Sequence, residues 1–457
     1  MITLATLILA ACCVAALFVL LKAWRRRASI YRYKVRTDQR YDFSRSGASQ
    51  ISGRIVNGNL VIAPPPPGGA ILLELRVRST LLGRWFEPCI EMELGQPQWR
   101  FRQPLERGAA GSRYIDLSPI VVQGEATLRL RGHHLKIIDQ AVDLHYLPRA
   151  VDPASQKILV IGTHPDDAEI AAFGLYADRN AYVVTLTAGE AGEPGPFRRF
   201  GDSAAHLEKG RNRAWNSVTV PMLGGLAINR TANLGFFDGT LAAMKDRPET
   251  AVKSMACEAQ FLDAFGQFHD PGLVEPRRGR GATWANLVSD LEHLVKTLQP
   301  DILVTPYPRL DWHPDHKLST VALFEALKNL DWRHGSLLLY TNHFVSSDHY
   351  PFGNAGELVS LPPGVDGIFF DGIVSNPLDP QMQARKHMAL DAMIDLRPDI
   401  QAGSVHSVAA SFASALKATI TGGRLDYFRQ AVRANELFFE VRVSSLYEPG
   451  VQDRILG

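Results

Sequence analysis

Two short segments of the sequence carry the same tripeptide, His-Pro-Asp, and each places further acids or histidines beside it. The first reads Thr163-His164-Pro165-Asp166-Asp167-Ala168-Glu169, and the second reads Asp311-Trp312-His313-Pro314-Asp315-His316. The composition of the chain predicts roughly 0.05 occurrences of this tripeptide, so two are not expected by chance. Together the segments supply three histidines and several carboxylates that could act at one site.

These residue types are suited to metal-assisted hydrolysis. Zinc binds imidazole nitrogens and carboxylate oxygens, and a catalytic zinc keeps one position open for water, whose pKa falls towards 7. A carboxylate beside that water can accept its proton, and an imidazole opposite can stabilise an oxyanion. Because Asp166 and Asp167 are adjacent, their side chains must diverge, so one can bind metal while the other faces water and substrate.

The elements around both segments predict where they lie. Residues 157–161, 181–186 and 301–305 are short apolar runs typical of buried strands, whereas 168–178 and 287–298 have helical spacing. Strands that alternate with helices favour an α/β fold, which we expect to be a Rossmann-like, mostly parallel sheet with helices on both faces. Ligands of such sheets bind beyond the carboxyl ends of the strands, and both His-Pro-Asp segments follow such ends.

An earlier part of the chain has a different pattern. Residues 73–78, 90–94 and 126–131 alternate apolar and charged side chains, which indicates strands with one buried and one exposed face. We therefore expect a small antiparallel β-sandwich domain over residues 35–150, before a catalytic domain over 155–457. Its Trp85, Trp99 and His133-His134 could form a glycan-stacking surface, although aromatic side chains on strands more often pack in the core.

The first residues predict a membrane anchor. Residues 2–21 form an apolar run of 20 residues broken by two threonines, long enough to cross a hydrocarbon core of about 30 Å. Lys22 and Arg25–Arg27 follow the run, whereas a signal peptide normally places its basic residues before it. Residues 1–34 are thus interpreted as a transmembrane helix with a basic flank, and the remainder as cytoplasmic, because basic flanks stay on that side.

Composition excludes several classes of protein. The chain of 457 residues has 49 Lys and Arg against 47 Asp and Glu, a formal net charge of +2, which gives no reason to expect a nucleic-acid partner. With 46% hydrophobic and 21% charged residues, large-scale disorder is excluded. Four cysteines in so long a chain cannot form a disulfide framework.

At the two His-Pro-Asp segments the sequence resembles the zinc-dependent de-N-acetylases of the PIG-L/LmbE-like type, the family of GlcNAc-phosphatidylinositol deacetylase. Both family motifs, His-Pro-Asp-Asp and Asp-x-His-Pro-Asp-His, are intact, and residues 186–190, 234–239 and 434–438 are similar to further family segments. The resemblance covers about residues 155–445. It implies that His164, Asp167 and His316 are metal ligands and that Asp166 is the general base. It also implies that His313 stabilises the oxyanion or acts as general acid, with Asp315 orienting it.

Substrate contacts are less well specified by the resemblance. Glu190, Arg211 and Asp311 are candidates for contact with the substrate. The alternative for the two acids is that they support other residues of the site. The alternative for Arg211, or for Arg213 beside it, is a solvated position on a helix. The chain departs from the family in a long stretch between the motifs. There, 193–199 and 276–281 read as inserted loops, and the arginines at 277, 278 and 280 as a solvated cluster rather than a phosphate clamp.

The sequence as a whole predicts a membrane-anchored N-deacetylase for an N-acetylated amino sugar of the GlcNAc type in a glycoconjugate. The family analogy favours a lipid-linked or envelope sugar. The implied cofactor is Zn²⁺, with Fe²⁺ as the alternative in vivo. Two other functions stay open. One is a metal amidohydrolase for a different N-acyl group, and the other is a non-catalytic, membrane-tethered glycan-binding protein.

Overall fold

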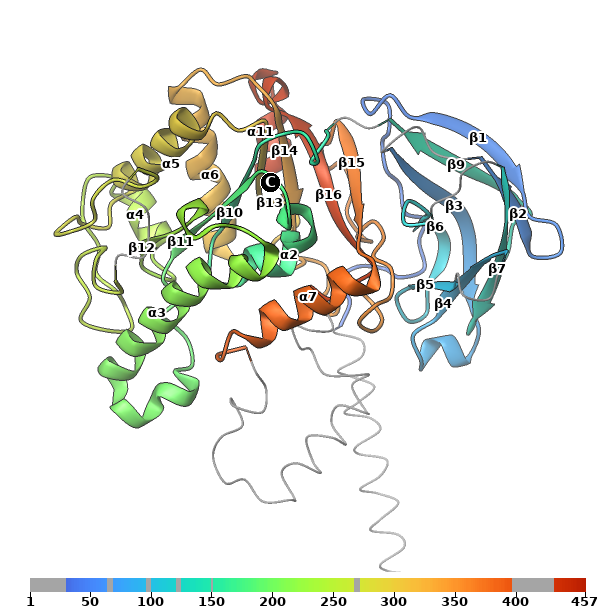
Figure 1. Cartoon of the computed structure of the whole chain (residues 1–457). Helices are drawn as coiled ribbons and strands as arrows, with labels where there is room; N and C mark the ends of the chain where they lie inside the picture. Colours follow the sequence, from blue (N-terminus) through green and yellow to red (C-terminus); the bar gives the residue numbers. More distant parts are fainter. Residues whose placement is uncertain are drawn as a thin grey trace, which may run out of the picture.

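The computed structural model describes residues 30–63, 69–95, 100–120, 125–148, 151–266, 272–396 and 431–457. A β-rich part and an α/β part lie beside each other (Figure 1). The mixed α/β architecture expected from the sequence is confirmed, whereas the domain boundaries near residues 35, 150 and 155 stay predictions.

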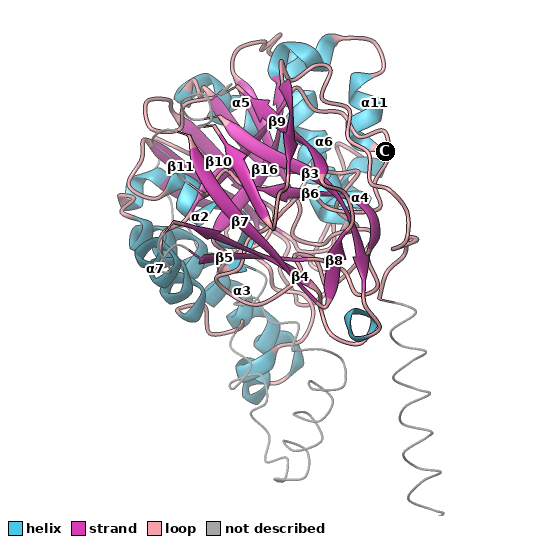
Figure 2. Ribbon diagram, turned by 90° about the vertical axis from the view of Figure 1, so that its right-hand side faces the viewer, coloured by secondary structure: helices cyan, strands magenta, loops and turns pink. Residues whose placement is uncertain are grey.

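Two antiparallel sheets form the β-rich part, which faces the viewer in Figure 2. Leu73 and Leu75 from one sheet meet Leu128 and Leu130 from the other in a common core, because alternate residues of each strand point inwards. The first sheet has the order β1 (Ser49–Arg54), β9 (Ala141–Leu147), β3 (Ala70–Ser79) and β6 (Ala110–Asp116), with β8 (Leu135–Ile137) paired to β3. The second has the order β2 (Asn59–Ile62), β7 (Ala126–His133), β4 (Cys89–Leu94) and β5 (Arg100–Pro104).

The α/β part is built on a sheet of seven strands. Their order is β12 (Thr231–Phe236), β11 (Ala181–Thr187), β10 (Ile158–Gly162), β13 (Ile302–Pro306), β14 (Ser336–Tyr340), β16 (Asn435–Arg442) and β15 (Gly372–Pro377). The first five strands are parallel, and β16 runs antiparallel to both of its neighbours. The parallel part agrees with the expected Rossmann-like sheet, and the antiparallel edge goes beyond it.

Helices cover both faces of this sheet, which explains why its central strands β10 and β13 are buried at every position. Ile158 and Val160 of β10 pack with α2 (Asp167–Tyr176) and α7 (Pro380–Asp391). Leu159 and Ile161 point to the opposite face, towards α5 (Trp284–Leu298) and α6 (Pro314–Asn329). The remaining helical elements are η1 (Leu82–Arg84), η2 (Gly195–Phe200), α3 (Asp202–Thr219), η3 (Val220–Gly224), η4 (Ile228–Arg230), α4 (Leu241–Asp246), η5 (Val443–Tyr447) and α11 (Val451–Leu456).

Aromatic side chains join the two parts. The ring of Tyr41 stacks on Phe439 of β16 with centroids 6.3 Å apart, and Phe43 lies 5.9 Å from Phe370. Around these rings, Arg45 pairs with Asp371 at 3.0 Å, and the Asn435 side chain of β16 donates to Asp116 of β6 at 2.9 Å. The chain before the first sheet therefore serves as packing between the two parts.

The structure does not support the predicted single-pass membrane localisation. No helix within the described ranges is both long and apolar enough to cross a bilayer. The longest, α3, has 18 residues, but Asp, Glu, Lys and Arg recur along it, and each such charge makes insertion into hydrocarbon costly. The apolar run of residues 2–21, on which the prediction was based, lies outside the described residues.

Candidate active site

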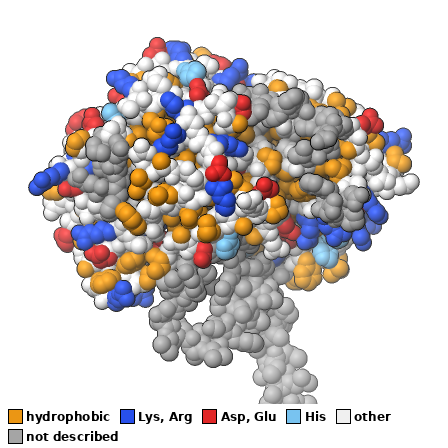
Figure 3. All heavy atoms as spheres, in the orientation of Figure 1, with side chains coloured by type: hydrophobic (Ala, Val, Ile, Leu, Met, Phe, Trp, Pro, Cys, Tyr) orange, Lys and Arg blue, Asp and Glu red, His pale blue; other side chains and the backbone are white. Residues whose placement is uncertain are grey.

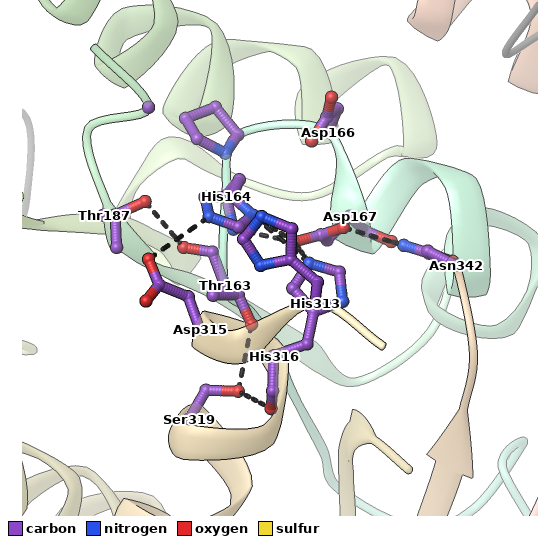
Figure 4. Close-up of polar contacts among 12 residues, drawn as sticks. Thr163, His164, Asp166, Asp167, Thr187, His313, Asp315, His316, Ser319 and Asn342 are labelled. Carbon is purple, nitrogen blue, oxygen red and sulfur yellow. Dashed lines mark hydrogen bonds and ion pairs between the residues drawn. The ribbon is translucent and has the colours of Figure 1, made fainter. Parts of the chain in front are cut away.

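Both His-Pro-Asp segments follow the carboxyl ends of strands that are neighbours in the sheet. His164 comes two residues after β10 and leads into α2, while His313 caps the N-terminus of α6, which follows β13. Because β10 and β13 pair in parallel, the two segments meet at one edge of the sheet. Figure 4 shows their side chains gathered there.

Three atoms form a compact triangle at this edge. His164 Nδ1 lies 3.2 Å from His316 Nε2, and Asp167 Oδ2 lies 3.3 Å from the first nitrogen and 3.1 Å from the second. All three side chains are buried. Zinc–ligand bonds of about 2.0–2.2 Å at tetrahedral angles place ligand atoms about 3.3–3.6 Å apart, close to the separations in the triangle, so the donors and their spacing fit a zinc ion.

Further side chains orient the members of this triangle. The second ring nitrogen of His164 lies 3.2 Å from Asp238 Oδ1, and that of His316 lies 3.0 Å from Asp311 Oδ2. The Asn342 amide donates to Asp167 Oδ1 at 2.8 Å, which leaves Oδ2 facing the two imidazoles. Such partners fix the tautomer and direction of metal-binding histidines. Asp311 therefore lies behind His316.

The charges in the triangle favour a cation among the three donors. Burial disfavours a charged His316, but Asp167 and Asp311 outweigh it and raise the pKa of His316 to about 10. Burial also opposes an ionised Asp167, yet the two imidazoles hold its pKa well below the usual range. A metal ion can take the place of the bound proton, because ligands of this kind bind metal in their deprotonated forms.

Asp166 is directed away from the triangle (Figure 4). The Asp166 backbone has a φ of 138°, a value that residues other than glycine rarely adopt. Backbone strain of this kind is common at functional sites. Burial raises the pKa of the Asp166 carboxyl to about 7, although the Arg213 guanidinium opposes this shift. A carboxylate with a pKa near neutrality can accept and release a proton at physiological pH.

Arg213 of α3 holds Asp166 in place. Its Nη2 lies 3.1 Å from Asp166 Oδ2 and donates to the Pro165 carbonyl at 2.6 Å, while Nε lies 3.0 Å from Asp395. The sequence indicated Arg211 as the candidate substrate contact and Arg213 only beside it. Arg211 is not brought to the site, because it is exposed and pairs with Glu208 of the same helix at 2.7 Å.

His313 lies over the triangle without belonging to it. Its ring centroid is 4.8 Å from that of His164 and 4.9 Å from that of His316. Burial, and then the neighbouring imidazoles, lower the pKa of His313 to about 4, so the ring is neutral at pH 7. Its Nδ1 is buried and has no hydrogen-bond partner among the described residues. This atom is thus available to a ligand.

The other two predicted acids support the surrounding loops. Asp315, predicted to orient His313, accepts from the Gly239 amide at 2.7 Å and lies 3.7 Å from His164 Nε2. Glu190 accepts from the Ser254 hydroxyl at 2.7 Å and from the Asp238 amide at 3.1 Å. Both acids therefore position the loop that carries Asp238.

Asp238 and Asn342 are the residues that sequence reasoning missed. Asp238 lies in the segment 234–239, which resembled the family without suggesting a role. Asn342 follows β14, another strand that ends at the same edge of the sheet, and that position was its only signal.

Comparisons with known proteins agree with this geometry. Residues 159–327, which include all three members of the triangle, match the profile of the PIG-L family, described as GlcNAc-PI de-N-acetylase. The α/β part is thus similar to the PIG-L family over these residues. The match supports a deacetylase-type hydrolase. No curated protein sequence gives a significant match to the chain.

Two solved structures resemble the fold at low identity. The A40926 pseudoaglycone deacetylase Dbv21 is 19% identical and has a TM-score of 0.32, with 63% of this chain and 98% of that chain covered. GalB, the 4-carboxy-2-hydroxymuconate hydratase from Pseudomonas putida, is 14% identical and has a TM-score of 0.29, with 63% and 96% covered. Likenesses at these TM-scores say nothing about the reaction of this chain.

Proposed function

We propose that the chain is a zinc-dependent N-deacetylase that hydrolyses the acetamide of an N-acetylated amino sugar of the GlcNAc type in a glycoconjugate. The observation that carries the proposal is the triangle of His164 Nδ1, Asp167 Oδ2 and His316 Nε2, with separations of 3.1–3.3 Å, beside a second carboxylate, Asp166, that contacts none of these atoms. A zinc ion held by the three atoms would polarise the amide carbonyl and lower the pKa of a water.

The chain's own groups supply the proton transfers. Asp166, with its pKa near 7, accepts a proton from the attacking water and can pass it to the leaving amine. Arg213 keeps the Asp166 carboxylate in one direction. His313 is neutral, and its buried Nδ1 has no hydrogen-bond partner among the described residues, so an N–H there can stabilise the oxyanion that develops in the transition state.

Trp312 supports a sugar as the substrate. Its indole is 46% exposed, although Asp311 and His316 beside it are buried, and its ring centroid lies 5.7 Å from that of His313 and 5.5 Å from that of His343. Indole faces are amphipathic surfaces on which ligand rings can pack. An amino sugar whose acetamide reached the triangle would place its pyranose ring beside this indole.

The test combines metal analysis with product release. Purified protein should contain about one zinc or iron per chain and should release acetate from a panel of free, nucleotide-linked and lipid-linked GlcNAc. A chelator should abolish the release, and added Zn²⁺ or Fe²⁺ should restore it. Release of a different acid would identify another N-acyl substrate, and binding without any release would identify a glycan-binding protein. Full activity after complete metal removal would contradict the proposal.

A further inference from the structure

A basic groove lies where the segment of residues 33–40 crosses the β-rich part, beside Gly364 and Asp366. It has a volume of about 830 Å³, and five exposed cationic side chains line it, with Asp38 and Asp366 as the only acids among the lining residues. The cations are Lys34, Arg36, Arg40, Arg76 and Arg78. The whole chain has a formal charge of only +2, and basic and acidic side chains are interspersed over the face shown in Figure 3. The groove is therefore a local concentration of positive charge.

The fold holds one set of these cations outwards. The segment before the first sheet lies against β6, where the Ala110 amide donates to the Val35 carbonyl at 3.1 Å. The buried Arg113 donates to the carbonyls of Val35 at 2.7 Å and Thr37 at 2.9 Å. With these carbonyls directed inwards, the side chains of Lys34 and Arg36 are exposed. Gly111 permits the contact, since a Cβ there would lie 2.6 Å from Asp38 Oδ1.

The other set comes from strand β3. Arg76 and Arg78 flank the buried Val77, so both lie on the exposed face at period two. Arg76 lies 3.8 Å from Asp139, a distance at which exposed pairs contribute little. Within the described ranges, no ion pair involves the side chains of Lys34, Arg36, Arg40 or Arg78. Four of the five cations are arginines, whose planar guanidinium groups suit the paired oxygens of phosphates.

We propose that this groove binds a phosphate-bearing glycan. A concave site of this volume fits a chain segment of a few sugar rings, whereas a flat bilayer surface does not enter a groove. Among the lining residues the only aromatic side chain is Tyr33, whose ring is packed against Gly364, so no free ring face can stack a nucleobase. Asp38, Asp366 and Thr37 line the same groove and can accept hydrogen bonds from the sugar hydroxyls that lie between the phosphates of such a glycan.

The proposal concerns binding alone and does not depend on the proposed deacetylation. It assigns the β-rich part the role of holding an anionic polymer, a role for which the metal triangle is not needed. Both activities can thus be measured on the same protein, and failure of one leaves the other intact.

The experiment measures binding of phosphorylated dextran to the full chain by calorimetry, with neutral dextran, a single-stranded oligonucleotide and phosphatidylglycerol vesicles as the other probes. Phosphorylated dextran should bind most tightly, and its affinity should fall as salt rises because the contacts are ionic. The double variant Arg36→Glu/Arg78→Glu should weaken binding by about tenfold or more, since two favourable contacts become repulsive.

The matched control is Arg129→Glu/Arg131→Glu, which makes the same change of charge at two exposed arginines on β7 of the other sheet. It should leave the affinity within about twofold, because these positions do not line the groove. Circular dichroism verifies that both variants fold. Equal loss in the two variants, equal binding of neutral dextran, or tighter binding of the oligonucleotide or the vesicles would each overturn the proposal.

Discussion

At the scale of single residues, two adjacent carboxylates have different surroundings. Asp167 Oδ2 lies within 3.3 Å of two imidazole nitrogens, whereas Asp166 Oδ2 lies 3.1 Å from Arg213. We expect Asp167→Ala to lose metal and activity together, because it removes one of three ligands. Asp166→Asn should keep the metal and lower kcat by about 10²–10⁴-fold, the usual contribution of a general base. Metal content by elemental analysis and kcat are measured for each variant.

Glu208→Gln is the control for these substitutions, since this acid is exposed and pairs with Arg211 away from the site. It should leave both quantities unchanged. Loss of metal from Asp166→Asn, together with retained metal and a lowered kcat in Asp167→Ala, would show that the two roles are reversed.

The carboxylates behind the histidines predict a second effect. Asp238 and Asp311 each lie within 3.2 Å of the outer nitrogen of a triangle histidine. Replacing such a partner typically weakens metal binding by about 10–100-fold, because the ring loses its fixed direction and some basicity. Asp238→Asn and Asp311→Asn should therefore need more zinc for half-maximal activity. A zinc titration of the metal-free variants measures this, and unchanged affinities would contradict the assignment.

The pH dependence follows from Asp166. The base must be ionised to accept a proton, and its pKa is raised to about 7, so kcat/KM should rise with pH and level off above neutrality. Arg213 stabilises the ionised form, and Arg213→Gln should therefore raise this pKa and move the rising limb to higher pH. A limb that stays in place in the variant would show that a different group limits the reaction.

Much of the site could be predicted at this scale because its residues lie in two short motifs. The motifs placed His164, Asp167 and His316 at adjacent strand ends, and the structure brings them together. Asp238 and Asn342 could not be predicted, since each depends on a loop path that tertiary packing sets. Asp311 and Glu190 were predicted to contact substrate or support the site, and both contact protein groups.

At the scale of elements, a buried ion pair stabilises part of the stretch between the two His-Pro-Asp motifs. Arg277 is 1% exposed and pairs with Asp290 of α5, whose other oxygen lies 2.8 Å from Arg280. The sequence suggested a solvated cluster here, and for Arg277 this is wrong. Composition could not reveal the partner, because the acid lies on the next helix.

Removing Arg277 should destabilise this element strongly. Arg277→Ala leaves Asp290 buried with one partner instead of two, and breaking a buried pair typically costs about 3–5 kcal/mol. Thermal unfolding followed by circular dichroism should show a clear loss of stability. Arg278→Ala is the matched control, because this neighbour is exposed and should change little. Similar unfolding temperatures for the two variants would contradict the structural role.

At the scale of the whole molecule, strand patterns predicted both kinds of sheet but not how they meet. Period-two alternation indicated the antiparallel strands, and continuous apolar runs indicated the parallel ones. The contact between the parts depends on Tyr41 and Phe43, which stand in no regular pattern, and on β16, which runs antiparallel to β14. Isolated aromatic residues in a loop carry no signal of the surface that they cover.

This contact predicts that the α/β part depends on the β-rich part for stability. Every member of the metal triangle lies within residues 164–316, so a fragment of residues 155–457 retains the ligands. The fragment would expose Phe370 and Phe439 and leave Asn435 without Asp116. We expect it to bind about one zinc yet unfold at a clearly lower temperature than the full chain, because apolar surface of this kind contributes about 25 cal/mol per Å² when buried.

In the full chain, Phe43→Ala should also lower the unfolding temperature, but by a smaller amount, since it removes one ring from the contact. Calorimetry and metal analysis of the three proteins measure this. A fragment as stable as the full chain would show that the two parts are independent, and a folded fragment without metal would show that the β-rich part shapes the site.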